Sequence, residues 1–205
     1  MADIVVNFLQ SGIKNPYIIV LLVAMFPLIE LKGAIPIGIR LGLNLWESAG
    51  LSFIGSTLVT VPIFFLLLYV FTLLKKIPLI NKLVYKLEAM FERKAEKISQ
   101  NKNDKPETIK QRFFKKALFI FVAVPLPLTG VWTGTAIAVF LNMKFRNAIV
   151  SLALGNLVAG TFITFITFLF KDYVDIIITG ILIIAVIMLI VLIIKIAVSK
   201  PKQTE

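Results

Sequence analysis

The chain has 205 residues, of which 59% are hydrophobic and 16% charged, and its mean hydropathy is +0.94. A soluble domain of this size cannot bury so much apolar surface, so the composition excludes a soluble globular protein and indicates an integral membrane protein. The net charge is +11, but the basic residues cluster beside apolar stretches, as topology signals do, and form no basic-aromatic surface for nucleic acid. The sequence has no cysteine and no histidine, so we expect no disulfide, no metal site and no cofactor.

The N-terminal residues predict a short amphipathic helix. Asp3 is a candidate N-cap, and apolar side chains recur behind it at helical spacing with polar ones opposite. We expect this helix to lie in the membrane interface.

Two apolar stretches of half the usual length follow, at residues 17–29 and 33–45. As a helix each would extend about 20 Å, which is short of the hydrocarbon core of about 30 Å. Pro27, Gly33 and Pro36 interrupt this short region. We therefore favour a re-entrant helical hairpin that enters and leaves by one face, with Pro27 and Pro36 as hinges. One long tilted helix kinked at Pro36 is the alternative.

The chain then predicts a full span and a polar connector. Residues 51–74 are long enough to cross a membrane, with Pro62 near the middle as a kink. Residues 75–116 form a polar segment whose first part keeps one apolar face. We predict an amphipathic connector at the membrane surface, with a helix restarting near Glu107.

The second half repeats the order of the first. Hinges at Pro125, Pro127 and Gly130 join two short apolar stretches, and a full span and a second span follow. The short stretches are residues 117–129 and 131–143, and the spans are residues 147–170 and 176–198.

A shift of the sequence by 100 residues supports an internal repeat. It aligns Pro27 with Pro127 and Gly55 with Gly155, and we expect the two glycines to be close-packing positions. The repeats cover about residues 16–74 and 117–170 of a single membrane domain. If both short stretches are hairpins, most of the 22 Lys and Arg residues fall on one side, which the positive-inside rule makes cytoplasmic.

This topology places the central segment and the C-terminus in the cytoplasm and lets the two hairpins enter from opposite faces. The predicted fold is thus an all-α integral membrane protein with an inverted repeat of hairpin plus span, a last transmembrane helix and an N-terminal interfacial helix. Inverted repeats of this kind are common in secondary transporters.

Three charged residues of the first hairpin are the leading site candidates. Glu30, Lys32 and Arg40 are costly in a bilayer, and such residues usually face protein or a water-filled cavity. The helix N-termini at the hairpin tips attract anions, and Lys32 and Arg40 would strengthen this attraction, while Glu30 could carry a coupling proton. Two structural alternatives remain open, namely a Glu30–Lys32 ion pair and an Arg40 that reaches back to the outer interface.

Uncharged polar residues near the tips complete the candidate site. Gly33, Thr129, Trp132 and Thr133 could contact a substrate or ion, although we favour a capping role for the three residues of the second hairpin. Asn156 predicts a hydrogen bond between packed helices.

Two motifs carry a resemblance to a known family. The motifs are Glu-Leu-Lys-Gly-Ala-Ile-Pro-Ile-Gly at residues 30–38 and Pro-Leu-Pro-Leu-Thr-Gly-Val-Trp-Thr-Gly at residues 125–134. From about residue 16 to 170 the chain resembles the small multidrug export protein family, whose plan is similar to that of the DedA, or VTT-domain, superfamily. The resemblance implies an inner-membrane protein with paired re-entrant loops and an export role. DedA-like relatives are linked to lipid movement between leaflets and to the proton-motive force, and by this resemblance Glu30, Lys32 and Arg40 map to the charged residues that matter there.

The sequence therefore predicts a proton-coupled exporter or flippase in the inner membrane, coupled through the first hairpin, for an amphipathic substrate that is lipid-like or drug-like and for which an anionic group is one option. Membrane lipids, the substrate and protons are the expected partners, and a homo-oligomer remains open. A passive scramblase or ion channel, or a membrane scaffold, is the alternative. We do not expect an enzyme, because the chain has no histidine, no cysteine and no paired intramembrane carboxylate.

Overall fold

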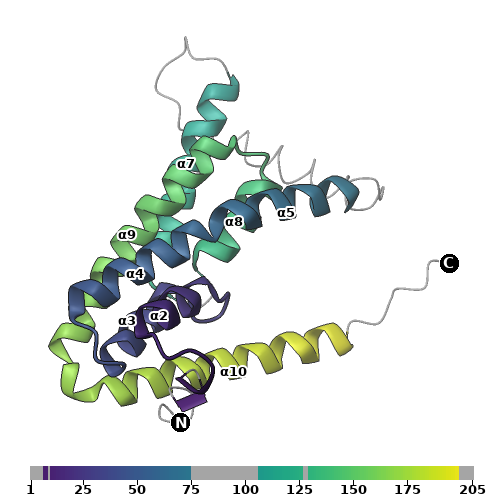
Figure 1. Ribbon diagram of the computed structural model, residues 1–205. Coiled ribbons are helices and arrows are strands. Elements are labelled where there is room, and N and C mark those ends of the chain that lie inside the picture. Colours follow the sequence, from purple (N-terminus) through teal and green to yellow (C-terminus); the bar gives the residue numbers. More distant parts are fainter. Residues whose placement is uncertain (1–6, 9, 75–105, 127–128, 199–205) are drawn as a thin grey trace.

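The computed structural model describes residues 7–8, 10–74, 106–126 and 129–198, and every regular element within these ranges is helical (Figure 1). Three stretches are long and apolar enough to cross a membrane: Leu45–Leu73, Phe145–Leu169 and Lys171–Val191. The fold class and the spans expected from the sequence are confirmed at this level. The elements are α2 (Pro16–Met25), α3 (Glu30–Arg40), α4 (Leu45–Leu58), α5 (Thr60–Leu74), α7 (Pro106–Ala123), α8 (Val131–Phe140), α9 (Phe145–Leu169), η1 (Lys171–Tyr173) and α10 (Val174–Val198).

Two predicted elements lie partly or wholly outside the described residues. Of the N-terminal amphipathic helix, positions 7, 8 and 10–12 are helical. The first part of the polar connector, residues 75–105, falls outside the described ranges, and α7 follows it from Pro106, close to the predicted restart at Glu107.

The first short stretches form two helices and not one rod. Asn15 caps α2, since its Oδ1 accepts the Tyr17 N–H at 2.9 Å. α2 ends at Met25, a turn over residues 26–29 follows, and α3 begins at Glu30 and continues through Pro36. The two helices pack on each other, so the alternative of one long kinked helix is wrong.

The following span begins six residues earlier than predicted. Asn44 and Glu47 form a capping box, in which each side chain accepts the backbone N–H of the other residue at 2.9 and 3.1 Å. This pair starts α4 at Leu45, where hydropathy alone had suggested residue 51.

A break at Val59 divides the same span into α4 and α5. Pro62, at which we predicted a kink, has no N–H to bond the Leu58 carbonyl four residues earlier. The interruption therefore lies one turn before the proline that causes it.

The turns that end α3 and α8 have the same form 100 residues apart. Leu43 N donates to Gly38 O at 3.0 Å, and Met143 N donates to Ala138 O at 2.9 Å. The central residue is left-handed in both turns, with φ of +90° at Gly42 and +50° at Asn142, which are residue types that tolerate this conformation.

Gly55 and Gly155 occupy equivalent places in the two spans. A Cβ on Gly55 would lie 2.5 Å from the Leu21 carbonyl oxygen of α2, and one on Gly155 would lie 2.8 Å from the Phe119 carbonyl oxygen of α7. Each span thus presses its glycine against the backbone of the first helix of the pair before it, α2 or α7. The predicted close-packing role of both glycines is confirmed.

A buried polar contact joins the two spans at the centre of the molecule. Asn156 Nδ2 of α9 donates to Ser56 Oγ at 2.7 Å and to Thr57 Oγ1 at 3.0 Å on α4. Hydrogen bonds of this kind hold helices together where water is absent. The packing role predicted for Asn156 is confirmed, and its main partner stands 100 residues earlier in the chain.

The last helix, α10, is attached mainly by its first turns. Val174 and Ile178 are buried in the core against α2 and α3, and Arg40 Nε lies 2.8 Å from Asp175 Oδ1. Figure 1 shows α10, in yellow, running past α3 and away from the bundle toward the C-terminus. Only 11% of its span is buried, so most of its apolar surface would face lipid.

Candidate functional site

The turn between α2 and α3, with the start of α3, packs against the segment that connects α7 to α8. Residues 124–126 and 129–130, between α7 and α8, are not helical, so carbonyl groups there need donors other than helical N–H groups. Lys32 Nζ supplies them, because it donates to Leu126 O at 2.7 Å and to Thr129 O at 2.5 Å. A side chain of the first helix pair thereby satisfies the broken backbone of the second.

Glu30 makes the complementary contact at the start of α8. Its Oε1 accepts the Trp132 backbone N–H at 3.1 Å, and the residue is only 6% exposed. A carboxylate at a helix N-terminus is favoured by the free N–H groups and by the helix dipole. A Cβ on Gly130 would overlap this carboxylate, so the glycine that we predicted as a hinge also makes room for Glu30.

Trp132 returns a bond to the first helix pair. Its indole Nε1 donates to the Met25 carbonyl at the end of α2, at 3.0 Å. Side chains of each helix pair thus form hydrogen bonds with backbone groups at the break in the other pair.

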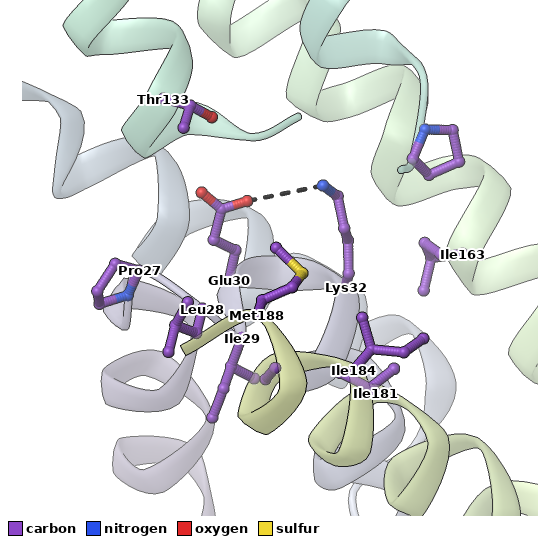
Figure 2. Close-up of a pocket in the computed structure, with 12 residues that line it drawn as sticks. Pro27, Leu28, Ile29, Glu30, Lys32, Thr133, Ile163, Ile181, Ile184 and Met188 are labelled. Atoms are coloured by element: carbon purple, nitrogen blue, oxygen red, sulfur yellow. Dashed lines mark ion pairs between the residues drawn. The ribbon is translucent and has the colours of Figure 1, made fainter. Parts of the chain in front are cut away.

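The two charges lie close together at this junction. Glu30 Oε2 and Lys32 Nζ are 3.8 Å apart, with side chains 7% and 14% exposed (Figure 2). Glu30 also has φ of +49°, a left-handed backbone that is rare for a non-glycine residue and costs about 1–2 kcal/mol. Strain of this kind persists where surrounding contacts hold the residue in place, and it clusters at functional sites.

A cavity of about 200 Å³ opens beside the charged pair. Figure 2 shows Glu30 and Lys32 reaching up from α3, with Ile181, Ile184 and Met188 of α10 below them and Thr133 of α8 above. One wall is therefore polar and the opposite wall is aliphatic. The cavity is lined by Pro27, Leu28, Ile29, Glu30, Lys32, Pro125, Thr133, Ile163, Ile181, Ile184, Ala185 and Met188.

Arg40 does not belong to this cluster. It lies at the other end of α3, about 15 Å from Glu30 along the helix, and its half-exposed side chain pairs with Asp175. Arg40 thus pairs with the first turn of α10 and does not line the cavity, while its predicted reach to the outer interface stays a prediction.

The remaining predicted site residues lie around the junction with structural contacts. Gly33 makes room for the side chain of Ile29, since a Cβ there would overlap Ile29 Cγ2. Thr129 Oγ1 donates to the Leu126 carbonyl at 2.9 Å, and Thr133 Oγ1 accepts the Gly130 N–H at 3.2 Å. These contacts correspond to the capping role that we favoured for the second hairpin.

Of the other predicted hinges, Pro27 and Pro125 line the cavity, Pro36 lies buried inside α3, and Pro127 is outside the described residues. Sequence reasoning missed the contribution of α10. That helix is apolar on all sides, so no periodicity marks the face that covers the charged pair.

A second, larger cavity of about 530 Å³ lies between α4 and α9. It is lined by aromatic, leucine and small side chains, including Gly160, where a Cβ would lie 2.6 Å from Cδ1 of Leu31, the residue between Glu30 and Lys32. Within the described ranges, no group of three or more acidic side chains is placed to hold a metal ion.

The fold and the site define a class of protein: a helical membrane protein of several spans whose two interrupted helix pairs meet at a buried pair of opposite charges. A family model described as "Putative small multi-drug export protein" matches residues 30–162, and the chain belongs to this family. The match begins at Glu30 and includes the whole of α8, but it ends before α10. No curated protein and no solved structure matches the chain.

Proposed function

We propose that this protein is a proton-coupled exporter or flippase whose substrate binds in the cavity between the helix junction and α10. The observation that carries the proposal is the pair of buried charges, Glu30 and Lys32, in the wall of a cavity whose opposite wall is aliphatic. Such a site suits an amphipathic molecule, because each part of the molecule meets a matching surface. The membership of an export family supports the same direction.

The proposal includes an inverted repeat of two re-entrant hairpins, α2–α3 and α7–α8, each followed by a span. Matching turns at Gly42 and Asn142 and matching glycine contacts support the repeat. Positions 100 residues apart also touch twice, Ser56 with Asn156 and Glu30 with Gly130, as positions near a two-fold axis do. The similarity of plan to the DedA superfamily and the inner-membrane location are parts of this proposal.

The topology predicts a specific labelling pattern. Single cysteines can be introduced cleanly because the chain has none. Lys14→Cys and Lys171→Cys, both at exposed positions, should react with an impermeant maleimide added outside intact cells, and Lys144→Cys should react only after the membrane is opened. Labelling of Lys14→Cys and Lys144→Cys from the same side of the membrane would refute hairpins that enter from opposite faces.

The proposed function is tested by measuring substrate flux before and after a chemical modification that fills the cavity. In proteoliposomes an imposed pH gradient should drive movement of an amphipathic substrate, and thiol modification of Ala185→Cys should reduce this flux at least tenfold by filling the cavity. Val186→Cys is the matched control, since Val186 is exposed on α10 and does not line the cavity. Equal flux after modification of both variants would refute the cavity as the route.

A structural role without transport is the second candidate. The bonds from Lys32 and Glu30 to the broken backbone favour it, because they give both charges a purpose without any substrate. No gradient-driven flux in the same assay would support this reading, whereas flux that ignores the pH gradient would indicate a passive scramblase or channel. We also propose that the protein is not an enzyme.

A further inference from the structure

The start of α8 is already occupied by an anion, the carboxylate of Glu30. The carboxylate sits where the helix presents backbone N–H groups, 3.8 Å from the Lys32 ammonium and in the wall of the cavity. A phosphate or carboxylate of a ligand would be recognised by the same groups. Glu30 therefore occupies a place whose backbone N–H group and Lys32 ammonium have the chemistry to bind an anionic headgroup.

We propose that the substrate is an anionic amphiphile whose headgroup replaces the Glu30 carboxylate at the start of α8 when Glu30 takes up a proton. This inference rests on the proposed transport site and adds the charge and shape of its substrate. In the exchange, one proton binds to a Glu30 carboxylate oxygen. The Trp132 N–H then donates its hydrogen bond to the headgroup in place of Glu30, and the aliphatic chain of the substrate lies against α10.

The charges around the cavity explain why the two events are coupled. Glu30 and Lys32 are the charged side chains in its described lining, while α8 contributes Thr133, α9 contributes Ile163, and α10 contributes four uncharged residues. When Glu30 is neutral, Lys32 has no counterion in this lining, and an anion restores the balance. Proton binding and anion binding must then strengthen each other by the same factor, so the inference selects the flippase form of the proposed function, in which the proton and the anion move in the same direction.

The same geometry disfavours a lipophilic cation. A cation would have to compete with Lys32 and the α8 N–H group for Glu30, and Lys32 is held in place by two carbonyl oxygens. No aromatic ring is among the lining residues that the structure describes, so cation–π contacts are not offered there.

The test is equilibrium binding to the full-length protein in nanodiscs at pH 5.5 and pH 8. Decanesulfonate keeps its charge between these values, so any pH dependence of its binding belongs to the protein. We expect it to bind about tenfold more tightly at pH 5.5. Decyl phosphate should bind as well, and decyltrimethylammonium and inorganic phosphate should bind at least tenfold more weakly than decyl phosphate.

Two variants sharpen the result. Glu30→Gln removes the internal anion, so decanesulfonate should bind tightly at both pH values. Ala185→Leu fills the part of the cavity that would hold the aliphatic chain of the ligand. It should weaken the binding of decyl phosphate without changing the binding of inorganic phosphate.

Three results would each overturn the inference. The first is tighter binding of the cation than of the anions, and the second is equal affinity of the wild-type protein for decanesulfonate at both pH values. The third is equal binding of inorganic phosphate and decyl phosphate. These failures are distinguishable from failure of the transport proposal. Gradient-driven flux of another substrate without this binding refutes the inference alone, whereas pH-dependent anion binding without flux refutes transport alone.

Discussion

Replacement of Lys32 by methionine is expected to lower the free energy of unfolding by about 3–5 kcal/mol. Methionine keeps much of the length of the lysine side chain but donates no hydrogen bond. The carbonyl oxygens of Leu126 and Thr129 would lose the lysine donor, although Leu126 O would keep its hydrogen bonds from Thr129, and Glu30 would remain as a buried charge without its 3.8 Å partner. Equilibrium unfolding in detergent micelles measures the change.

Arg40→Met is the matched control for this loss. Arg40 pairs with Asp175 at 2.8 Å, but the two side chains are 41% and 58% exposed, so the variant should lose at most about 1 kcal/mol. The double variant Glu30→Gln with Lys32→Met should recover part of the stability lost by Lys32→Met, because it leaves no unpaired charge. Similar losses for Lys32→Met and Arg40→Met would show that the junction does not depend on this ammonium.

Local sequence signals were sufficient for the helix breaks. Pro27 marked the turn where α2 gives way to α3, and Pro125 and Gly130 marked the corresponding region before α8. Gly33 and the predicted hinge Pro36, by contrast, lie inside the continuous helix α3. Proline and glycine act through their own backbone geometry, so their effect is visible without knowledge of the partner helices. The same reasoning identified Glu30 and Lys32 as unusual, because a charge in an apolar stretch stands out by itself.

The partners of those charges were not predictable in the same way. Lys32 bonds to carbonyl oxygens 94 and 97 positions away, and backbone acceptors leave no mark in the sequence. The place of Arg40 depends on Asp175, which the sequence showed only as one of several charges near a loop. Long-range contacts of this kind depend on how the helix pairs dock.

Replacement of Glu30 by glutamine should abolish proton-driven transport while the protein stays folded. The amide oxygen of glutamine can still accept the Trp132 N–H, and Lys32 loses its counterion but keeps its two carbonyl acceptors, so we expect a smaller loss of stability than for Lys32→Met. What the variant loses is the ability to bind and release a proton at the wall of the cavity. The expected effect on flux is therefore much larger than the effect on folding.

Glu47→Gln is the matched control for the proton site. Glu47 is also a carboxylate at the first turn of a helix, where it accepts the Asn44 N–H and the Tyr17 hydroxyl, but it does not line the cavity. Its replacement should leave flux within about twofold of the wild-type value, because Glu47 is remote from the cavity. A twofold change in flux corresponds to less than about 1 kcal/mol of activation free energy.

The most direct measurement compares flux of decyl phosphate into or out of proteoliposomes under a pH gradient for the wild-type protein, Glu30→Gln and Glu47→Gln. We predict gradient-driven flux for the wild-type protein and Glu47→Gln, and none for Glu30→Gln at unchanged folded content. Wild-type flux from a folded Glu30→Gln protein would contradict a proton-coupled site at the junction of the two helix pairs.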